Sequence, residues 1–171
     1  LETPLEVTLE VMKKISEVGG VTILDPAPMP KNDLDHVFTV VDILTPNQHE
    51  AERLLKQKIC CSEDAIQGAI ALVKRGDFKA VILTMGEQGV AYSEDGVQGE
   101  WLPAFIVDAI DTVAAGDCFN GALAAAMVDG ASLRDSILFA MAAAAMSVTR
   151  RGASSSIPSL LEVQDFLARL R

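Results

Sequence analysis

Apolar residues follow two different spacings along the first part of the chain. Spacing of three to four residues predicts helices with one buried face in three segments: 5–18, a stretch that begins after Asn47, and 65–74. Short continuous apolar runs alternate with these segments and predict buried strands: 21–24, 40–44 and 80–83. Two later runs, 90–93 and 97–102, flank a turn and predict a hairpin. This order predicts crossover units and a mostly parallel α/β sheet with an antiparallel hairpin added late.

The chain changes character after Asp111. Two long Ala-rich helices follow, then a Ser-rich loop at 154–156 and an amphipathic helix over 159–170. The longest apolar stretch, 137–148, is shorter than the roughly 20 residues that a membrane-spanning helix needs, which favours a buried helix. Neither an internal repeat nor a linker rich in Gly or Pro divides the sequence. We therefore predict a single α/β domain over 1–171.

Composition narrows the classes of function. The 171 residues are half apolar, which is enough for a hydrophobic core without disulfide or metal cross-links. Lys and Arg number 14 against 24 Asp and Glu, a net charge of -10 that argues against nucleic acid or a membrane surface as partner. The adjacent Cys60 and Cys61 form no disulfide framework, which favours a reducing, cytoplasmic compartment. Because the chain begins at Leu1, we expect either processing or a longer protein.

Ligands of open α/β sheets bind beyond the carboxyl ends of the strands, so the loops to consider follow Leu24, Leu44, Leu83 and Ile110. The last of these loops contains Asp-Thr-Val-Ala-Ala-Gly-Asp at 111–117, directly before an Ala-rich helix. Small residues there leave backbone N–H groups uncovered at a helix N-terminus, where an anion is favoured. Asp117 allows two interpretations: a plain helix cap, or a general base that delivers a hydroxyl to a phosphoryl group.

Other chemistries lack their motifs. The sequence contains no Gly-x-x-x-x-Gly-Lys-Ser/Thr loop, which excludes a P-loop enzyme. Neither His36 nor His49 lies near a serine in a nucleophile-elbow motif, which argues against acyl transfer. Cys60-Cys61 has no second Cys or His pair to complete a zinc site.

Five segments resemble, in order and spacing, the signatures of the ribokinase-like (PfkB) carbohydrate kinases, and among them most closely the ribokinases. The segments are 25–28, 45–52, 84–89, 111–122 and 142–158. Asp25 stands where the family has Asn, and Ala114 where many members have Gly. The resemblance implies a three-layer α/β/α fold with a mostly parallel sheet and a late β-hairpin. This chain would be its C-terminal nucleotide-binding portion, without the N-terminal part and the lid.

The resemblance also implies a reaction, the ATP-dependent phosphorylation of a sugar primary hydroxyl, with D-ribose converted to ribose 5-phosphate. Asp117 would be the catalytic base and would contact the sugar. The backbone of Ala114, Ala115 and Gly116 would form an anion hole with that of Asp117. The implied ATP-binding residues are Asn47, Thr84, Met85, Gly86, Glu87, Gln88, Gly89, Gly116, Asp117 and Met141.

Further ligands are implied in the same way. Glu2 would bind sugar hydroxyls, although a solvated terminal residue is the alternative. Asn47 and Glu50 would serve the magnesium–phosphate end, Glu50 through water; the alternative is that they only form a capping box. A monovalent cation, normally potassium, would lie beside the anion hole. Its implied ligands are Asp111, Val113, Ser147, Arg150, Gly152 and Ser156.

Two alternatives to a ribose kinase stay open. One is a kinase of the same family that acts on fructose, deoxyribose or a nucleoside. The other is a non-catalytic nucleotide-binding or assembly fragment. As partners we expect a small-molecule sugar and ATP, with a homodimer implied for the full-length family member. This chain alone would be inactive or weakly active, because most sugar-recognition residues lie in the family's N-terminal part.

Overall fold

The computed structural model describes residues 3–29, 38–76 and 78–169. It divides into two compact units, 1–103 and 104–171. The single domain over 1–171 stays a prediction. In the described ranges, no helix is both long enough and apolar enough to cross a membrane.

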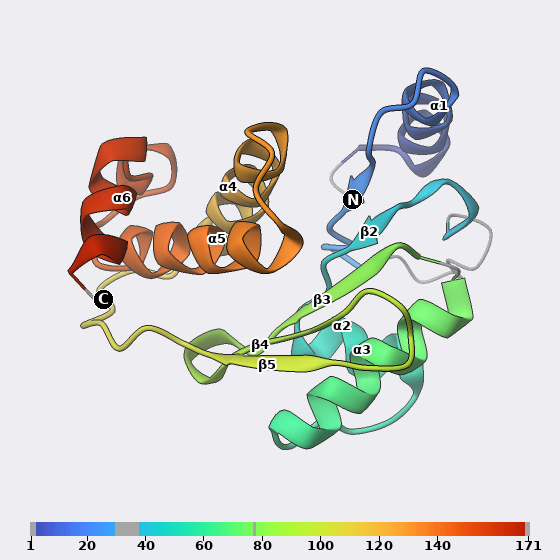
Figure 1. The fold of residues 1–171 in the computed structure, drawn as a ribbon, viewed down its shortest axis with the longest axis horizontal. Coiled ribbons are helices and arrows are strands. Elements are labelled where there is room, and N and C mark those ends of the chain that lie inside the picture. The colour runs from blue at the N-terminus through green and yellow to red at the C-terminus, as the bar shows by residue number, and fades with distance from the viewer. Residues whose placement is uncertain (1–2, 30–37, 77, 170–171) are drawn as a thin grey trace. The chain divides into compact units, whose positions relative to one another are not determined.

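The first unit contains a five-stranded sheet in the order β1-β2-β3-β4-β5 (Figure 1). The strands are β1 Ile23–Leu24, β2 Ile43–Leu44, β3 Ala80–Thr84, β4 Gly89–Ser93 and β5 Glu100–Pro103. The first three are parallel, β4 is antiparallel to β3, and β5 is antiparallel to β4. The parallel strands and the late hairpin are confirmed.

Strands β1 and β2 are shorter than the apolar runs that predict them, because a side chain replaces part of the backbone ladder. Asp42 Oδ2 accepts the Thr22 N–H at 2.8 Å, and the Asp42 N–H donates to Thr22 Oγ1 at 2.9 Å. Lys79 Nζ lies 2.7 Å from Asp42 Oδ1. Burial alone would raise the pKa of Asp42, but the hydrogen bonds from Lys79 and Thr22 outweigh it and lower the pKa. Val40 belongs instead to a 3₁₀ turn, Phe38–Val40.

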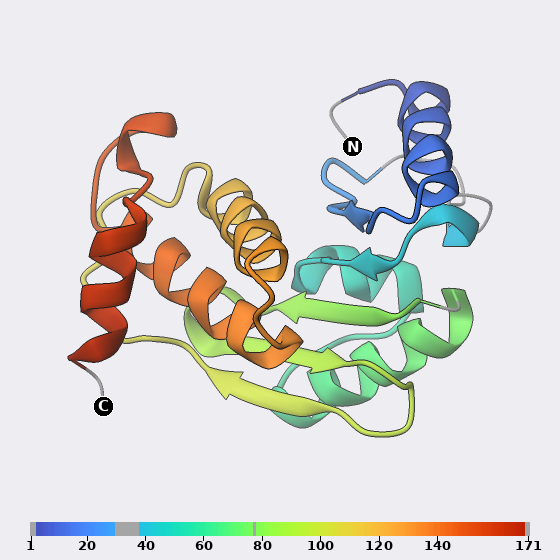
Figure 2. The same ribbon diagram turned by 45° about the horizontal axis from the view of Figure 1, so that its top comes forward.

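Among the described residues of this unit, three helices accompany the sheet: α1 Leu5–Glu17, α2 Gln48–Leu55 and α3 Ser62–Gly76. Figures 1 and 2 show α2 and α3 on the same face of the sheet, and α3 packs against β3, β4 and β5. Ala69 and Leu72 of α3 are fully buried in one core with Leu83 of β3. The predicted helices are confirmed. Helix α3 begins at Ser62 and includes the predicted helical segment 65–74.

The second unit is helical, with α4 Ala115–Val128, α5 Leu133–Ser147 and α6 Leu160–Ala168. Helix α5 packs against both α4 and α6 (Figure 1). Cys118, Ala143 and Val163 form its small core, beside which the Phe105 and Phe166 rings meet edge to face. The two predicted Ala-rich helices are confirmed. The expectation of a strand ending at Ile110 is wrong, because the N–H groups of Ile110 and Asp111 donate to the Val148 carbonyl and pair with no strand.

Candidate functional site

The carboxyl ends of the three parallel strands meet at one edge of the sheet. The Thr45 N–H donates to the Leu24 carbonyl at 2.9 Å, and the Thr84 N–H donates to the Pro46 carbonyl at 3.0 Å. Asn47 forms a parallel bridge with Thr84. The loops 25–28, 45–50 and 84–89 therefore begin side by side, at the position where open α/β sheets bind ligands.

Asn47 and Glu50 begin α2 with a reciprocal capping box. The Glu50 N–H donates to Asn47 Oδ1 at 3.0 Å, and the Asn47 N–H donates to Glu50 Oε2 at 2.8 Å. The capping alternative is therefore confirmed as local structure. It does not exclude a ligand, because each carboxylate oxygen has two lone pairs and the cap uses one of them.

Glu50 is an unusual capping residue because it is buried, with 7% of its surface exposed. Burial raises the pKa of Glu50, hydrogen bonds from Asn47 oppose that shift, and the charge of Asp25 adds to it. Two neighbouring carboxyl groups fit a magnesium ion, which prefers oxygen ligands and retains water. Among residues 3–29, 38–76 and 78–169, no cluster of three or more His, Cys, Asp or Glu could hold a metal ion.

Replacing Glu50 by Gln is expected to raise thermal stability at neutral pH. A folded-state pKa above the unfolded value means that the stability from this group is complete at low pH and is lost as the pH rises through the folded pKa. Gln cannot ionise and still accepts the Asn47 N–H. In thermal unfolding from about pH 4 to pH 8, the Tm of Glu50→Gln minus that of the parent protein should therefore increase as the pH rises.

Glu52→Gln on the same helix is the matched control with the opposite sign. Hydrogen bonds from Lys58 Nζ at 2.9 Å and the Ile59 N–H at 3.1 Å lower the pKa of Glu52. Its stabilisation is present above the unfolded pKa and lost as the pH falls, so Glu52→Gln should lose Tm at neutral pH. If both variants lose Tm at neutral pH, the account of Glu50 is wrong.

The loop that joins β3 to β4 is a tight turn through the 3₁₀ segment Gly86–Gln88. The Met85 N–H donates to the Gly89 carbonyl at 2.8 Å, and the Gln88 N–H donates to the Met85 carbonyl at 3.1 Å. Gly86, Glu87 and Gln88 are exposed, whereas the Met85 side chain is buried in the sheet core. Of the residues predicted to bind ATP here, Met85 therefore offers only its backbone.

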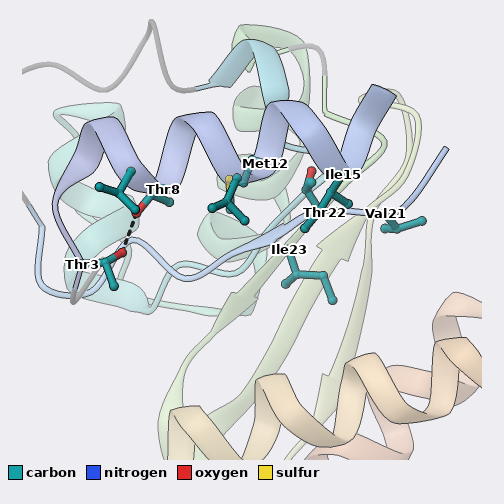
Figure 3. Close-up of a pocket in the computed structure, with 9 residues that line it drawn as sticks. Thr3, Thr8, Met12, Ile15, Val21, Thr22 and Ile23 are labelled. Atoms are coloured by element: carbon teal, nitrogen blue, oxygen red, sulfur yellow. Dashed lines mark hydrogen bonds between the residues drawn. The ribbon is translucent and has the colours of Figure 1, made fainter. Parts of the chain in front are cut away.

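An apolar groove of about 340 Å³ lies between α1 and β1 (Figure 3). Its lining residues are Thr3, Val7, Thr8, Val11, Met12, Ile15, Val21, Thr22 and Ile23. The lining reaches β1 at its amino end, whereas Asp25 follows its carboxyl end. None of the described residues that line the groove has a titratable side chain. Glu2, the predicted sugar contact, lies outside the described residues.

The first turn of α4 carries the predicted base. Ala114 is the N-cap residue with φ 60, a left-handed conformation that is rare outside Gly, and no side-chain hydrogen bond caps the helix. Asp117 is exposed in that turn. Asp117 is therefore not the N-cap residue of α4 but lies three residues further on, within the first turn. The Ala115 N–H donates weakly to the Thr112 carbonyl at 3.3 Å. The N–H groups of the first turn that helix geometry leaves without an intrahelical acceptor are therefore those of Gly116 and Asp117.

Asp111 holds the loop before α4 against the loop after α5. Its Oδ1 accepts the Val113 N–H at 3.1 Å and its Oδ2 accepts the Gly152 N–H at 3.0 Å. These bonds, from Gly152 first, lower the pKa of Asp111, so the group is an anion. An anionic carboxylate beside loop carbonyl groups fits a large monovalent cation. Three of the predicted ligands, Asp111, Val113 and Gly152, are thus brought together.

Two further predicted cation ligands, Ser147 and Ser156, have local partners. Ser147 Oγ donates to the Ala144 carbonyl at 2.8 Å and Ser156 Oγ donates to the Ala153 carbonyl at 2.7 Å, which leaves both hydroxyl oxygens able to accept or ligate. Met141 lies in the middle of α5.

Sequence reasoning missed Glu162, which binds the Arg150 side chain. The pattern Ser159-x-x-Glu162 indicates a capping box at the start of α6, but it carries no signal for the contact with Arg150.

Comparison with known proteins identifies the relatives of this chain. A sequence model of the pfkB family of carbohydrate kinases matches residues 2–160. The chain is 39% identical to a ribokinase of Haemophilus influenzae, over 98% of this chain and 54% of the relative. It is 41% identical to a ribokinase of Schizosaccharomyces pombe, over 95% and 52%.

A solved structure gives the same result for the fold. The structure of Arabidopsis thaliana ribokinase complexed with ribose and ATP matches with a TM-score of 0.88 and 31% identity, over 96% of this chain and 53% of that chain. The ribokinase-like α/β fold is thus confirmed, and the chain spans about half the length of the relatives it matches. This chain belongs to the pfkB family of carbohydrate kinases.

Proposed function

We propose that the protein carrying this chain transfers the γ-phosphoryl group of ATP to the primary hydroxyl of D-ribose. The observation that carries the proposal is the first turn of α4, where the exposed Asp117 carboxylate accompanies the N–H groups of Gly116 and Asp117. A base beside an anion-binding turn suits phosphoryl transfer, in which positioning and charge stabilisation supply most of the catalysis. The names of the relatives support ribose as the sugar.

In this reaction the sugar hydroxyl oxygen attacks the γ-phosphorus while Asp117 takes the hydroxyl proton. A new P–O bond to the sugar forms, and the bond from the γ-phosphorus to the bridging oxygen breaks, so that ADP leaves with that oxygen. Backbone N–H groups of the α4 turn stabilise the negative charge on the transferring group. Asp117 then holds the proton until it passes to solvent.

The nucleotide is proposed to bind along the loop between β3 and β4. Exposed backbone at Gly86–Gln88 suits close approach of a nucleotide, because Gly86 has no side chain to block it. Magnesium, when bound, would neutralise phosphate charge, and Glu50 would hold it through water. Asp25 adds a second negative charge near Glu50, which favours a cation there.

Asp111 and its neighbours would hold a monovalent cation beside the anion turn, with carbonyl oxygens replacing part of its hydration shell. For the whole protein we further propose a cytoplasmic homodimer. The free thiols of Cys60 and Cys61, both exposed, suit the reducing compartment.

A substrate panel tests the proposed activity. The protein carrying this chain, with magnesium and potassium, should form ADP fastest with D-ribose when compared at equal concentration with fructose, deoxyribose and a nucleoside. Faster ADP formation with another of these compounds would still indicate a kinase, but one whose preferred substrate is not D-ribose. ATP binding without ADP formation on any of them would instead indicate a non-catalytic nucleotide-binding protein.

A further inference from the structure

One carboxylate that the proposed reaction does not use lies in the first turn of α6. Glu162 Oε2 accepts the Ser159 N–H and the Ser159 hydroxyl, each at 2.8 Å. Its Oε1 accepts from Arg150 Nη2 at 2.6 Å. Both oxygens therefore have fixed partners, one at the cap of α6 and one in the loop that precedes the helix.

Arg150 lies in the loop 148–156, which contains candidate cation ligands. The Arg150 side chain is 35% exposed and the Glu162 side chain 44%, so their ion pair is partly shielded from water. A planar guanidinium bound to a carboxylate has a defined direction, which restricts the peptide groups on either side of Arg150. Glu162 also neutralises a positive charge on the residue whose carbonyl would ligate a cation.

The same loop is bound at its other end by Asp111. Gly152 donates its N–H to Asp111 Oδ2, and Asp111 Oδ1 accepts the Val113 N–H, one residue before the N-cap of α4. A continuous series of contacts therefore runs from the cap of α6, through the Arg150 loop, to the turn that carries the candidate anion site. No other side chain in this series bonds to the Arg150 guanidinium in the part of the unit that the structure describes.

We infer that Glu162 is a positioning residue, which holds Arg150 and thereby fixes the loop 148–152 and the turn at Asp111. The contact geometry stands by itself, whereas its consequence for cation binding rests on the proposed function. Glu162 touches neither substrate nor the reacting atoms in this account. Its effect is transmitted through Arg150.

Amide hydrogen exchange in potassium-free buffer tests the positioning directly. Glu162→Gln retains the size and the cap acceptor of Glu162 but loses the charge that binds Arg150. We expect the Gly152 and Val113 amides to exchange about 3- to 5-fold faster, the change that losing a partly exposed ion pair supports. Asp165→Asn removes the same charge from an exposed position of the same helix and should leave these amides unchanged.

Potassium titration gives a readout that a merely capping role would not change. Thermal unfolding is measured for the parent protein and both variants in potassium and in tetramethylammonium chloride. If Glu162 served only as a cap, any change in the Tm of Glu162→Gln would be equal in both salts. A positioning role should also raise the potassium concentration for half-maximal stabilisation about 10-fold, as for other groups that orient metal ligands.

The two possible failures are distinguishable. If the Gly152 amide exchanges equally in the parent protein and in Glu162→Gln, the positioning role is overturned. If potassium has no effect on the parent protein, the proposed cation site is wrong, while faster exchange at Gly152 in Glu162→Gln still supports the positioning role.

Discussion

Asp117→Asn is expected to lower kcat for sugar phosphorylation by about 100- to 10,000-fold, the range over which a general base contributes. The amide is close in size to the carboxylate but cannot take the hydroxyl proton at neutral pH. Because Asp117 is exposed in the first turn of α4, the substitution should leave folding intact. Steady-state kinetics with a coupled assay for ADP measures the loss, and calorimetry measures retained ATP binding.

Asp129→Asn is the matched control at the other end of the same helix. Asp129 is the exposed C-cap residue of α4, and its replacement removes one negative charge without touching the candidate anion turn. Its kcat should equal that of the parent protein. Equal activity of Asp117→Asn and Asp129→Asn would reject Asp117 as the base.

Gly89→Ala is expected to destabilise the first unit by about 3 kcal/mol, through backbone strain and overpacking together. Gly89 has φ 140, a conformation that side chains rarely adopt. A Cβ added there would overlap the Leu102 carbonyl oxygen on the paired strand β5. Since Gly89 also accepts the Met85 N–H, the strain would reach the candidate nucleotide loop.

Gly86→Ala provides the control within the same loop. Gly86 has φ 55, but a Cβ there meets no heavy atom within 4 Å. Only the left-handed conformation is penalised, at a cost of about 1 kcal/mol. Urea unfolding of the two variants should therefore differ by about 2 kcal/mol in free energy of unfolding. Equal destabilisation would show that close packing against β5 does not limit this position.

The fold was predictable where local patterns and tertiary packing agree. Helix α2 follows from Asn47 and Glu50, whose spacing alone predicts the capping box that the structure contains. Strand β2 is shorter than its apolar run because Asp42 and Thr22 bond through side chains, an interaction between segments distant in sequence. Apolar spacing carries no signal for such a contact.

The sequence predicts which loops form the candidate site, but it predicts few of the contacts between their side chains. The first turn of α4 was recognisable from small residues before an Ala-rich helix, with Asp117 inside it. The proximity of Asp25 to Glu50 depends on parallel pairing of β1 with β2, which places their carboxyl ends together. The hydrogen bond between Arg150 and Glu162 joins a loop to a later helix, so the sequence pattern around either residue does not predict the contact.

The most direct test of the proposed function is the chemical position of the transferred phosphate. The protein carrying this chain is incubated with ATP, magnesium, potassium and D-ribose, and the product is examined by phosphorus NMR. The account predicts a phosphomonoester whose signal is split by the two protons of a CH2–O–P group, formed in step with ADP and only when ribose is present. A doublet from an anomeric phosphate, or inorganic phosphate alone, would contradict transfer to the primary hydroxyl.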